Sequence, residues 1–249
     1  AIKTASLKLT QNVSDWTGLQ ANLDKERATG VTEQRITLTK DITAAVGDTP
    51  LMVTQDNTTI DLNGHSIDGT GLTKVINIAE GVKDCVMLNG TIKGGSAEYG
   101  GAIQVWKNAT LGLSGMTLSG NKAAMEGGAI YNLGTVDLLK STIENNTADA
   151  GGAIANKDGA IMRLYYTGIT GNQATAGNGG GIENLGTLQM DNTVITANNT
   201  TGNGGGLSDS KDASLALIEQ VVINGNTKGA ELTDKGTAKD GTGTADNLY

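Results

Sequence analysis

The sequence repeats one short phrase at a nearly constant interval, and this period constrains the fold more than any other feature. Two small residues followed by an aliphatic one, as in "GGAI", recur five times at steps of 27, 24, 28 and 25 residues. Repetition at a fixed period is the sequence signature of a repeat architecture, so this period indicates the class of fold. The glycine that stands two residues before the aliphatic one occupies positions Gly101, Gly128, Gly152, Gly180 and Gly205.

An asparagine recurs in step with this phrase. It stands three residues after an aliphatic residue, as in "IENN" and "ITGN", at Asn121, Asn146, Asn172, Asn198 and Asn226. The aliphatic residue itself can be followed further towards the N-terminus, which gives about eight repeats of about 26 residues. Its positions are Ile42, Ile67, Ile92, Leu118, Ile143, Ile169, Ile195 and Ile223.

Apolar and polar residues alternate around these positions, as in "TIDLNGHSI" and "TVDLLKSTI". This is the periodicity of short strands separated by Gly and Asn turns. Leucine-rich repeats share the length but have another spacing of Leu and Asn, and ankyrin-type units need helices. We therefore predict an all-β fold, a single-stranded right-handed parallel β-helix of about eight coils. With coils about 4.8 Å apart, the rod would be about 40 Å long.

Stacking explains why glycine and asparagine recur. Where stacked backbones turn sharply, φ can be positive and a Cβ would collide with the next coil, so we expect Gly in each coil. Buried turns leave backbone groups that stacked amides can satisfy, so we predict a structural ladder of these asparagines. A second polar column follows two residues after each aliphatic residue of the phrase, at Asn132, Asn156, Asn184 and Asp209.

The N-terminal stretch "VSDWTGLQANLDKE" predicts a helix over residues 14–26. Ser14 or Asp15 would cap it, and Trp16, Leu19 and Leu23 would lie on one face against the first coil. Such a cap would cover the exposed sheet edge at this end. We divide the chain into 1–30, an N-terminal strand and capping helix; 31–227, the β-helix; and 228–249, a polar C-terminal turn or linker. We expect it to be a segment of a longer protein.

Composition excludes several classes of function. The formal net charge of −8 and pI of about 4.6 leave no basic surface for nucleic acid or anionic lipid. The single cysteine, Cys85, rules out an intrachain disulfide, and its alternating apolar context predicts a buried thiol. No apolar run is long enough to span a membrane, and the first residues have no signal-peptide core.

The two motifs together resemble the GG-Ala-Ile and Phe-x-x-Asn repeats of the polymorphic outer membrane proteins, whose passengers are autotransporter-type adhesins. The first motif stands at 100–103, 127–130 and 151–154, and the resemblance extends over about residues 98–227. In the second motif, aliphatic residues such as Ile143 and Ile169 replace the Phe of that family. The resemblance implies a bacterial surface or secreted adhesin, and other bacterial surface β-helix proteins have similar coils.

Two polar groups are the candidates for chemistry. His65 alternates with Asp61 and Asn63, which would place all three on one strand face, and a turn-stabilising polar cluster is the simpler interpretation. Glu98, Glu126 and Asp149 precede the tracked glycines in successive coils, and Asn178 and Asn203 continue the column. These acids are weak candidates for Ca²⁺, which prefers oxygen ligands; solvated loop acids are the alternative.

Catalysis of the polysaccharide lyase type needs a positioned base and cationic stabilisation. The three arginines, Arg27, Arg35 and Arg163, are not grouped in the sequence. We therefore predict no catalytic residues, no cofactor and no enzymatic activity. The expected function is that of an extracellular adhesin segment, monomeric, which binds a host cell-surface protein or glycan. The alternatives are a purely structural stalk and, by analogy of fold, a polysaccharide lyase or hydrolase.

Overall fold

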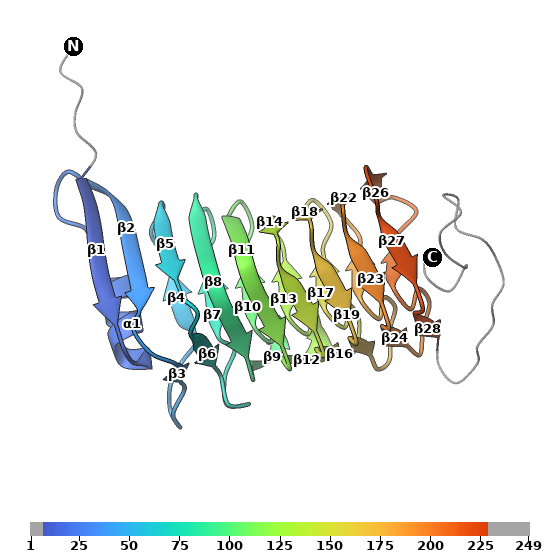
Figure 1. Ribbon diagram of the computed structural model, residues 1–249, viewed down its shortest axis with the longest axis horizontal. Helices are drawn as coiled ribbons and strands as arrows, with labels where there is room; N and C mark the ends of the chain where they lie inside the picture. The colour runs from blue at the N-terminus through green and yellow to red at the C-terminus, as the bar shows by residue number, and fades with distance from the viewer. Residues whose placement is uncertain (1–6, 229–249) are drawn as a thin grey trace, which may run out of the picture.

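The computed structural model describes residues 7–228 and shows a parallel β-solenoid (Figure 1). Consecutive coils lie side by side along the long axis, and every strand pairing within the described residues is parallel, as in β10 with β13 and β14 with β18. The predicted fold class is thus confirmed. Each complete coil passes through three sheets, which form the long faces of the rod.

Sheet A has 15 strands in two limbs, because most coils bend once while crossing it. Its first limb contains β1 Leu7–Val13, β2 Val31–Leu38, β5 Thr58–Asp61, β8 Cys85–Lys93, β11 Thr110–Ser119, β14 Thr135–Leu139, β18 Ile161–Tyr165, β22 Thr187–Asp191 and β26 Ser214–Leu217. The second limb contains β3 Ile42–Thr43, β6 Ser66–Asp68, β15 Thr142–Glu144, β19 Gly168–Thr170, β23 Val194–Thr196 and β27 Val222–Asn224, and the C-terminal halves of β8 and β11 complete it.

Sheets B and C are built from shorter strands. Sheet B contains β4 Leu51–Val53, β7 Ile76–Ile78, β10 Ile103–Val105, β13 Ile130–Asn132, β17 Ile154–Asn156, β21 Ile182–Asn184 and β25 Leu207–Asp209. Sheet C contains β9 Ser96–Tyr99, β12 Lys122–Glu126, β16 Thr147–Ala148, β20 Gln173–Ala174, β24 Asn199–Thr200 and β28 Thr227–Lys228.

The aliphatic column predicted from the period is a continuous row in the core. Ile67 pairs with Ile92, Leu118 with Ile143, and Ile169 with Ile195, each one coil apart. All eight members of the column are buried. The aliphatic residues of the glycine phrase form a second such row in sheet B, so apolar side chains from facing sheets fill the interior.

Helix α1, Trp16–Asp24, covers one sheet edge at the N-terminal end. Asp15 caps it by accepting the backbone N–H of Gly18 at 2.7 Å, and Trp16, Leu19 and Leu23 are buried as predicted. The helix packs on β4, the outermost strand of sheet B, where Gln20 Oε1 accepts the backbone N–H of Met52 at 3.0 Å. The side chain of Gln20 thus accepts a backbone N–H of this edge strand, as a neighbouring strand would. Residues 229–249 of the expected C-terminal segment lie outside the described residues.

Two adjacent glycines share the role that the sequence assigned to one. The tracked Gly128 does not have a positive φ, but an added Cβ would lie 2.1 Å from the carbonyl oxygen of Gly152 in the next coil. The preceding Gly127 has φ +68°. Close approach between coils and the left-handed turn are therefore separate constraints on neighbouring residues. The same division recurs at Gly100–Gly101, Gly151–Gly152, Gly179–Gly180 and Gly204–Gly205.

Candidate functional site on the outer face of sheet B

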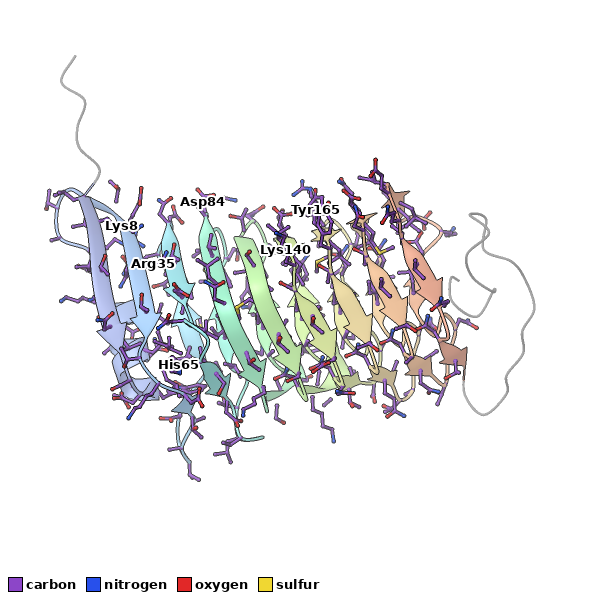
Figure 2. All side chains as sticks on the ribbon, viewed as in Figure 1. Lys8, Arg35, His65, Asp84, Lys140 and Tyr165 are labelled. Carbon is purple, nitrogen blue, oxygen red and sulfur yellow. The ribbon has the colours of Figure 1, made fainter. Side chains whose placement is uncertain are left out.

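The expected cluster of His65 with Asp61 and Asn63 does not form. A turn at Asn63 and Gly64, both with positive φ, separates His65 from the strand that carries Asp61. Asp61 instead forms an ion pair with Arg35 and accepts the backbone N–H of Asn63 at 2.9 Å. Figure 2 shows Arg35 on the face of sheet A and His65 lower in the view, close to strand β6. Asp61 and Asn63 therefore stabilise a turn.

His65 has a different acidic neighbour, Asp41, in the preceding coil. Its Nδ1 lies 3.5 Å from Asp41 Oδ1. The same oxygen accepts the backbone N–H of Ser66 at 2.8 Å, and this hydrogen bond lowers the pKa of Asp41 below its usual range. Both side chains are accessible to water. The pair links two turns and has no second base or acid beside it among the contacts found in residues 7–228.

The acids before the glycines also differ from the expected column. An irregularity in β12 aligns Glu126 with Tyr99 and Ala150, so Glu98 and Asp149 are not its register partners. Asp149 accepts the Thr175 hydroxyl at 2.8 Å, and Glu98 is exposed. Within residues 7–228, no group of three acidic, His or Cys side chains is arranged to hold a metal ion. The bulge in β12 shifts the register by one residue, and this shift is why the three acids do not form a column.

The asparagine column forms a buried hydrogen-bonded ladder between sheets A and C. The Nδ2 and the backbone N–H of Asn146 both donate to Asn172 Oδ1, each at 2.9 Å. Asn172 donates in the same way to Asn198. Each amide also donates to backbone carbonyls of the turn, such as that of Ile143 at 3.0 Å from Asn172 Nδ2. The ladder runs from Asn121 to Asn226, and in each bond between two asparagine side chains the donor is the one nearer the N-terminus.

The second column forms a parallel ladder along sheet B. Asn132 donates to Asn156, Asn156 to Asn184, and Asn184 to Asp209, over distances of 2.6 to 2.9 Å. An ionised carboxylate can accept this last hydrogen bond but has no N–H with which to donate to a further residue. Burial raises the pKa of Asp209, and the hydrogen bond from Asn184 partly opposes this. Both columns therefore serve the scaffold and leave ligand binding to other residues.

The outer face of sheet B presents one residue from the middle of each three-residue strand. Register places Gln104 beside Tyr131, Tyr131 beside Ala155, and Ala155 beside Glu183. These residues follow the core aliphatic residue directly, so the alternation of a strand points them outwards. The full row is Met52, Asn77, Gln104, Tyr131, Ala155, Glu183 and Ser208.

Five side chains gather beside this face, and they are here called the tyrosine–carboxylate cluster. Tyr131 and Glu183 come from sheet B, Tyr99 and Glu126 from the adjoining sheet C, and Lys157 from the turn after β17. The rings of Tyr99 and Tyr131 lie with centroids 5.0 Å apart and are tilted by 49°. Lys157 Nζ lies 2.7 Å from Glu126 Oε2 and 6.0 Å from the centre of the Tyr131 ring. All five are half-buried, so the cluster is preorganised and still reachable from solvent.

The two carboxylates of the cluster have unequal environments. Burial raises the pKa of Glu183; the nearby Lys157 opposes this rise and Glu126 adds to it. Glu126 is held in the ion pair with Lys157. Burial likewise raises the pKa of the Tyr131 hydroxyl, with smaller contributions from Glu126 and Tyr99. The cluster can therefore offer carboxylate acceptors, a cation and aromatic rings to one ligand.

A second polar group adjoins this cluster at Gln104. Lys74 Nζ donates to Gln104 Oε1 and lies 3.4 Å from Asn77 Oδ1. Burial lowers the pKa of Lys74 to about 8, and the charge of Glu98 opposes the shift. Polar and aromatic side chains thus continue over several coils of the same face.

Sequence reasoning missed this cluster. Glu126 was weighed only with other acids, and Tyr131, Lys157 and Glu183 were not weighed at all. A signal was present, because the residue after the aliphatic member of each glycine phrase must point outwards from a short strand.

Of the arginines, Arg163 pairs with Asp137 at 3.0 Å, and Arg27 donates to the hydroxyl of Thr58 at 2.8 Å.

Two segments that contain part of the asparagine ladders and two of the glycine phrases match a known family. Residues 115–133 and 140–157 match the Chlamydia polymorphic membrane protein repeat. Each matched segment contains one asparagine of each ladder, Asn121 and Asn132 or Asn146 and Asn156, and one Gly-Gly-Ala-Ile phrase. The resemblance stated from the sequence is thus confirmed.

No curated protein and no solved structure matches the chain. Among residues 7–228, the structure has no helix both long enough and apolar enough to cross a membrane.

Proposed function

We propose that this chain is a segment of a surface-exposed passenger that binds a host surface component through the tyrosine–carboxylate cluster, without catalysis. The observation that carries the proposal is the cluster itself, of which Glu126, Tyr131 and Lys157 lie in the segments that match polymorphic membrane protein repeats. Tyrosines are amphipathic, lose little conformational freedom and are enriched at binding sites.

The scaffold supports this function because it holds the cluster rigidly. Backbone pairing and two buried ladders fix each coil to the next, so strands β10, β13, β17 and β21 present their outward residues at constant spacing. A preorganised surface binds with less loss of conformational freedom than a mobile one. Stiffness also keeps the surface at a set distance along the rod, as repeat proteins do with extended binding faces.

Binding of the purified chain to immobilised host cells and to a glycan array tests the proposal. We expect saturable binding that Tyr131→Ala weakens at least tenfold, since removal of an aromatic anchor is costly. A matched control is Tyr166→Ala, which removes an exposed tyrosine at a turn of sheet A. Its effect has to be read with a check of folding, because Tyr166 has positive φ. Equal binding by the parent and Tyr131→Ala would refute the assignment of this face.

A second candidate, glycoside hydrolysis, is favoured by the unequal carboxylates Glu126 and Glu183. Paired acids in different environments are the pattern of a general acid beside a base or nucleophile. Lys157 forms an ion pair with Glu126, which ties up one of these two acids, so we place this candidate second. New reducing ends from polysaccharide, lost in Glu183→Gln, would establish hydrolysis and replace the proposal of a non-catalytic segment.

A further inference from the structure

The turns between sheets B and A alternate in length along the C-terminal half of the rod. Between one sheet B strand and the next sheet A strand, four, two, four, two and four residues intervene in successive coils. The long turns are 106–109, 157–160 and 210–213, and the short turns are 133–134 and 185–186. The edge of the rod therefore has three projecting turns. The recess at the short turn between two neighbouring projections is here called a step.

Each long turn closes on itself through a backbone hydrogen bond. Ala109 N–H donates to the Trp106 carbonyl at 3.2 Å, and Ala160 N–H donates to the Lys157 carbonyl at 2.9 Å. Ala213 N–H and the Ser210 carbonyl repeat this contact at 2.9 Å. Bonds of this kind are typical of β-turns, so each projection has a fixed shape.

Each short turn contains a glycine that lies directly against the preceding long turn. A Cβ on Gly134 would stand 2.5 Å from the carbonyl oxygen of Ala109, and one on Gly186 would stand 2.4 Å from that of Ala160. Glycine is thus required for the step, and the requirement recurs two coils later. Leu133 and Leu185 precede these glycines and are half-buried.

The first step holds a cavity of about 440 Å³, which we call the notch. Leu133 and Gly134 line it, with Lys107 and Asn108 from one long turn and Asp158 from the other. Lys107 and Asp158 are exposed, and neither forms an ion pair within the described residues 7–228. The notch therefore offers an apolar floor between walls that can donate and accept hydrogen bonds.

The position equivalent to the notch lies two coils further on, at Leu185 between turns 157–160 and 210–213. Two coils span about 9.6 Å at a strand spacing of about 4.8 Å. In an extended peptide, side chains on one face recur about every 6.6 Å, and this distance does not match the spacing of the two leucines. A β-1,4-linked glycan matches better, because each ring is turned over relative to the last, so one face recurs once per disaccharide.

The charges of the walls favour a neutral glycan over an acidic one. Lys83 and Lys107 line the notch together with Asp158, and Lys83 Nζ already donates to the carbonyl oxygen of Asn108. Asp158 stands between Lys107 and the exposed pair of Lys211 and Asp212, so a carboxylate on every disaccharide would meet an acid at the middle turn. An acetamido group suits the site better, because its methyl can contact a leucine while its amide and the ring hydroxyls meet Lys107, Asn108 or Asp158.

We propose that this edge binds a linear β-1,4-linked N-acetylhexosamine glycan along the rod axis, with acetamido methyl groups of alternate rings on Leu133 and Leu185. The proposal names a ligand class for a second surface, and it does not depend on the tyrosine–carboxylate cluster. Because both contacts belong to one ligand, a chain that reaches both leucines should bind more tightly than one that reaches a single leucine.

Isothermal titration of the full chain with chitohexaose, chitobiose and cellohexaose tests the proposal. Cellohexaose has the same linkage and length as chitohexaose but lacks the acetamido groups. We expect chitohexaose to bind at least tenfold more tightly than either of the others. Leu133→Arg or Leu185→Arg should reduce its affinity to that of chitobiose, which has only one ring of each orientation and reaches a single leucine. Leu139→Arg, at an exposed leucine on β14, is the matched control and should bind as the parent does.

Equal affinity for chitohexaose and cellohexaose, or no binding of chitohexaose, would overturn the proposal. Unchanged chitohexaose binding in a folded Leu133→Arg, Leu185→Arg double variant would overturn it as well, with circular dichroism as the check of folding. Host-cell binding that persists in that double variant and is lost in Tyr131→Ala concerns the cluster alone. Failure at the notch and failure of the proposed function are thus distinguishable.

Discussion

Replacement of Asn172 by Ala tests how much the buried ladder contributes to stability. Asn172 Oδ1 accepts both the backbone N–H and the Nδ2 of Asn146, each at 2.9 Å. Ala would leave these two buried donors without that acceptor and would also remove the donors that reach Asn198 and the carbonyl of Ile143. Asn146 Nδ2 keeps the carbonyl oxygens of Leu118 and Glu144 as acceptors, so the backbone N–H of Asn146 is the donor left unsatisfied. At about 1–3 kcal/mol for a buried group without a partner, this donor alone predicts a loss of about 1–3 kcal/mol.

Equilibrium unfolding in urea, followed by circular dichroism, measures this loss. Asn224→Ala is the control, because Asn224 is exposed on β27 and should change stability by less than about 0.5 kcal/mol. The slope of the transition is also informative, since a break in the middle of a solenoid can separate the two halves into independent units. A loss below about 1 kcal/mol with an unchanged slope would contradict the view that these amides are buried and mutually satisfied.

Three further predictions concern single residues. Gly152→Ala should destabilise by about 3 kcal/mol in the same assay, because its Cβ would lie 2.2 Å from the Gly180 carbonyl oxygen; Gly168→Ala, where no atom lies within 4 Å, should not. Cys85 should resist a thiol reagent until urea unfolds the chain, since burial raises its pKa to about 12; rapid native labelling would disprove its placement. Because folding raises the pKa of Asp209, the native state binds a proton more readily than the unfolded state, and stability falls as pH rises through that range. Asp209→Asn should therefore raise the melting temperature at pH 7, by an amount that shrinks as the pH falls to the carboxyl range.

The parts of the structure that repeat were predictable from the sequence. The aliphatic column and the position of Asn146 follow from a period that every coil obeys, because stacking forces equivalent residues onto equivalent places. The capping helix was predictable as well, since Asp15 and the spacing from Trp16 to Leu23 are local signals. These features depend on short-range chemistry or on simple repetition.

The candidate sites were not predictable in the same way, because they depend on departures from the period. A one-residue bulge near Glu126 changed which side chains meet, and a tight turn at Gly64 moved His65 away from Asp61. The contact between Lys157 and Glu126 joins residues in different coils through a long, flexible side chain. Such contacts arise from turn lengths and side-chain reach, which a column of aligned repeats does not contain.

The ladder and the parallel strands also determine how the rod responds to tension. Strands lie across the long axis, so a force that pulls the two ends apart loads the bonds of one coil boundary at a time instead of all boundaries together. From Asn121 to Asn226, each boundary combines backbone bonds with a buried amide bond, as between Asn146 and Asn172. Release of one coil of about 26 residues would free about 90 Å of chain at roughly 3.4 Å per residue. A rod built this way should lengthen by about one coil at a time under load and dissipate work at each step.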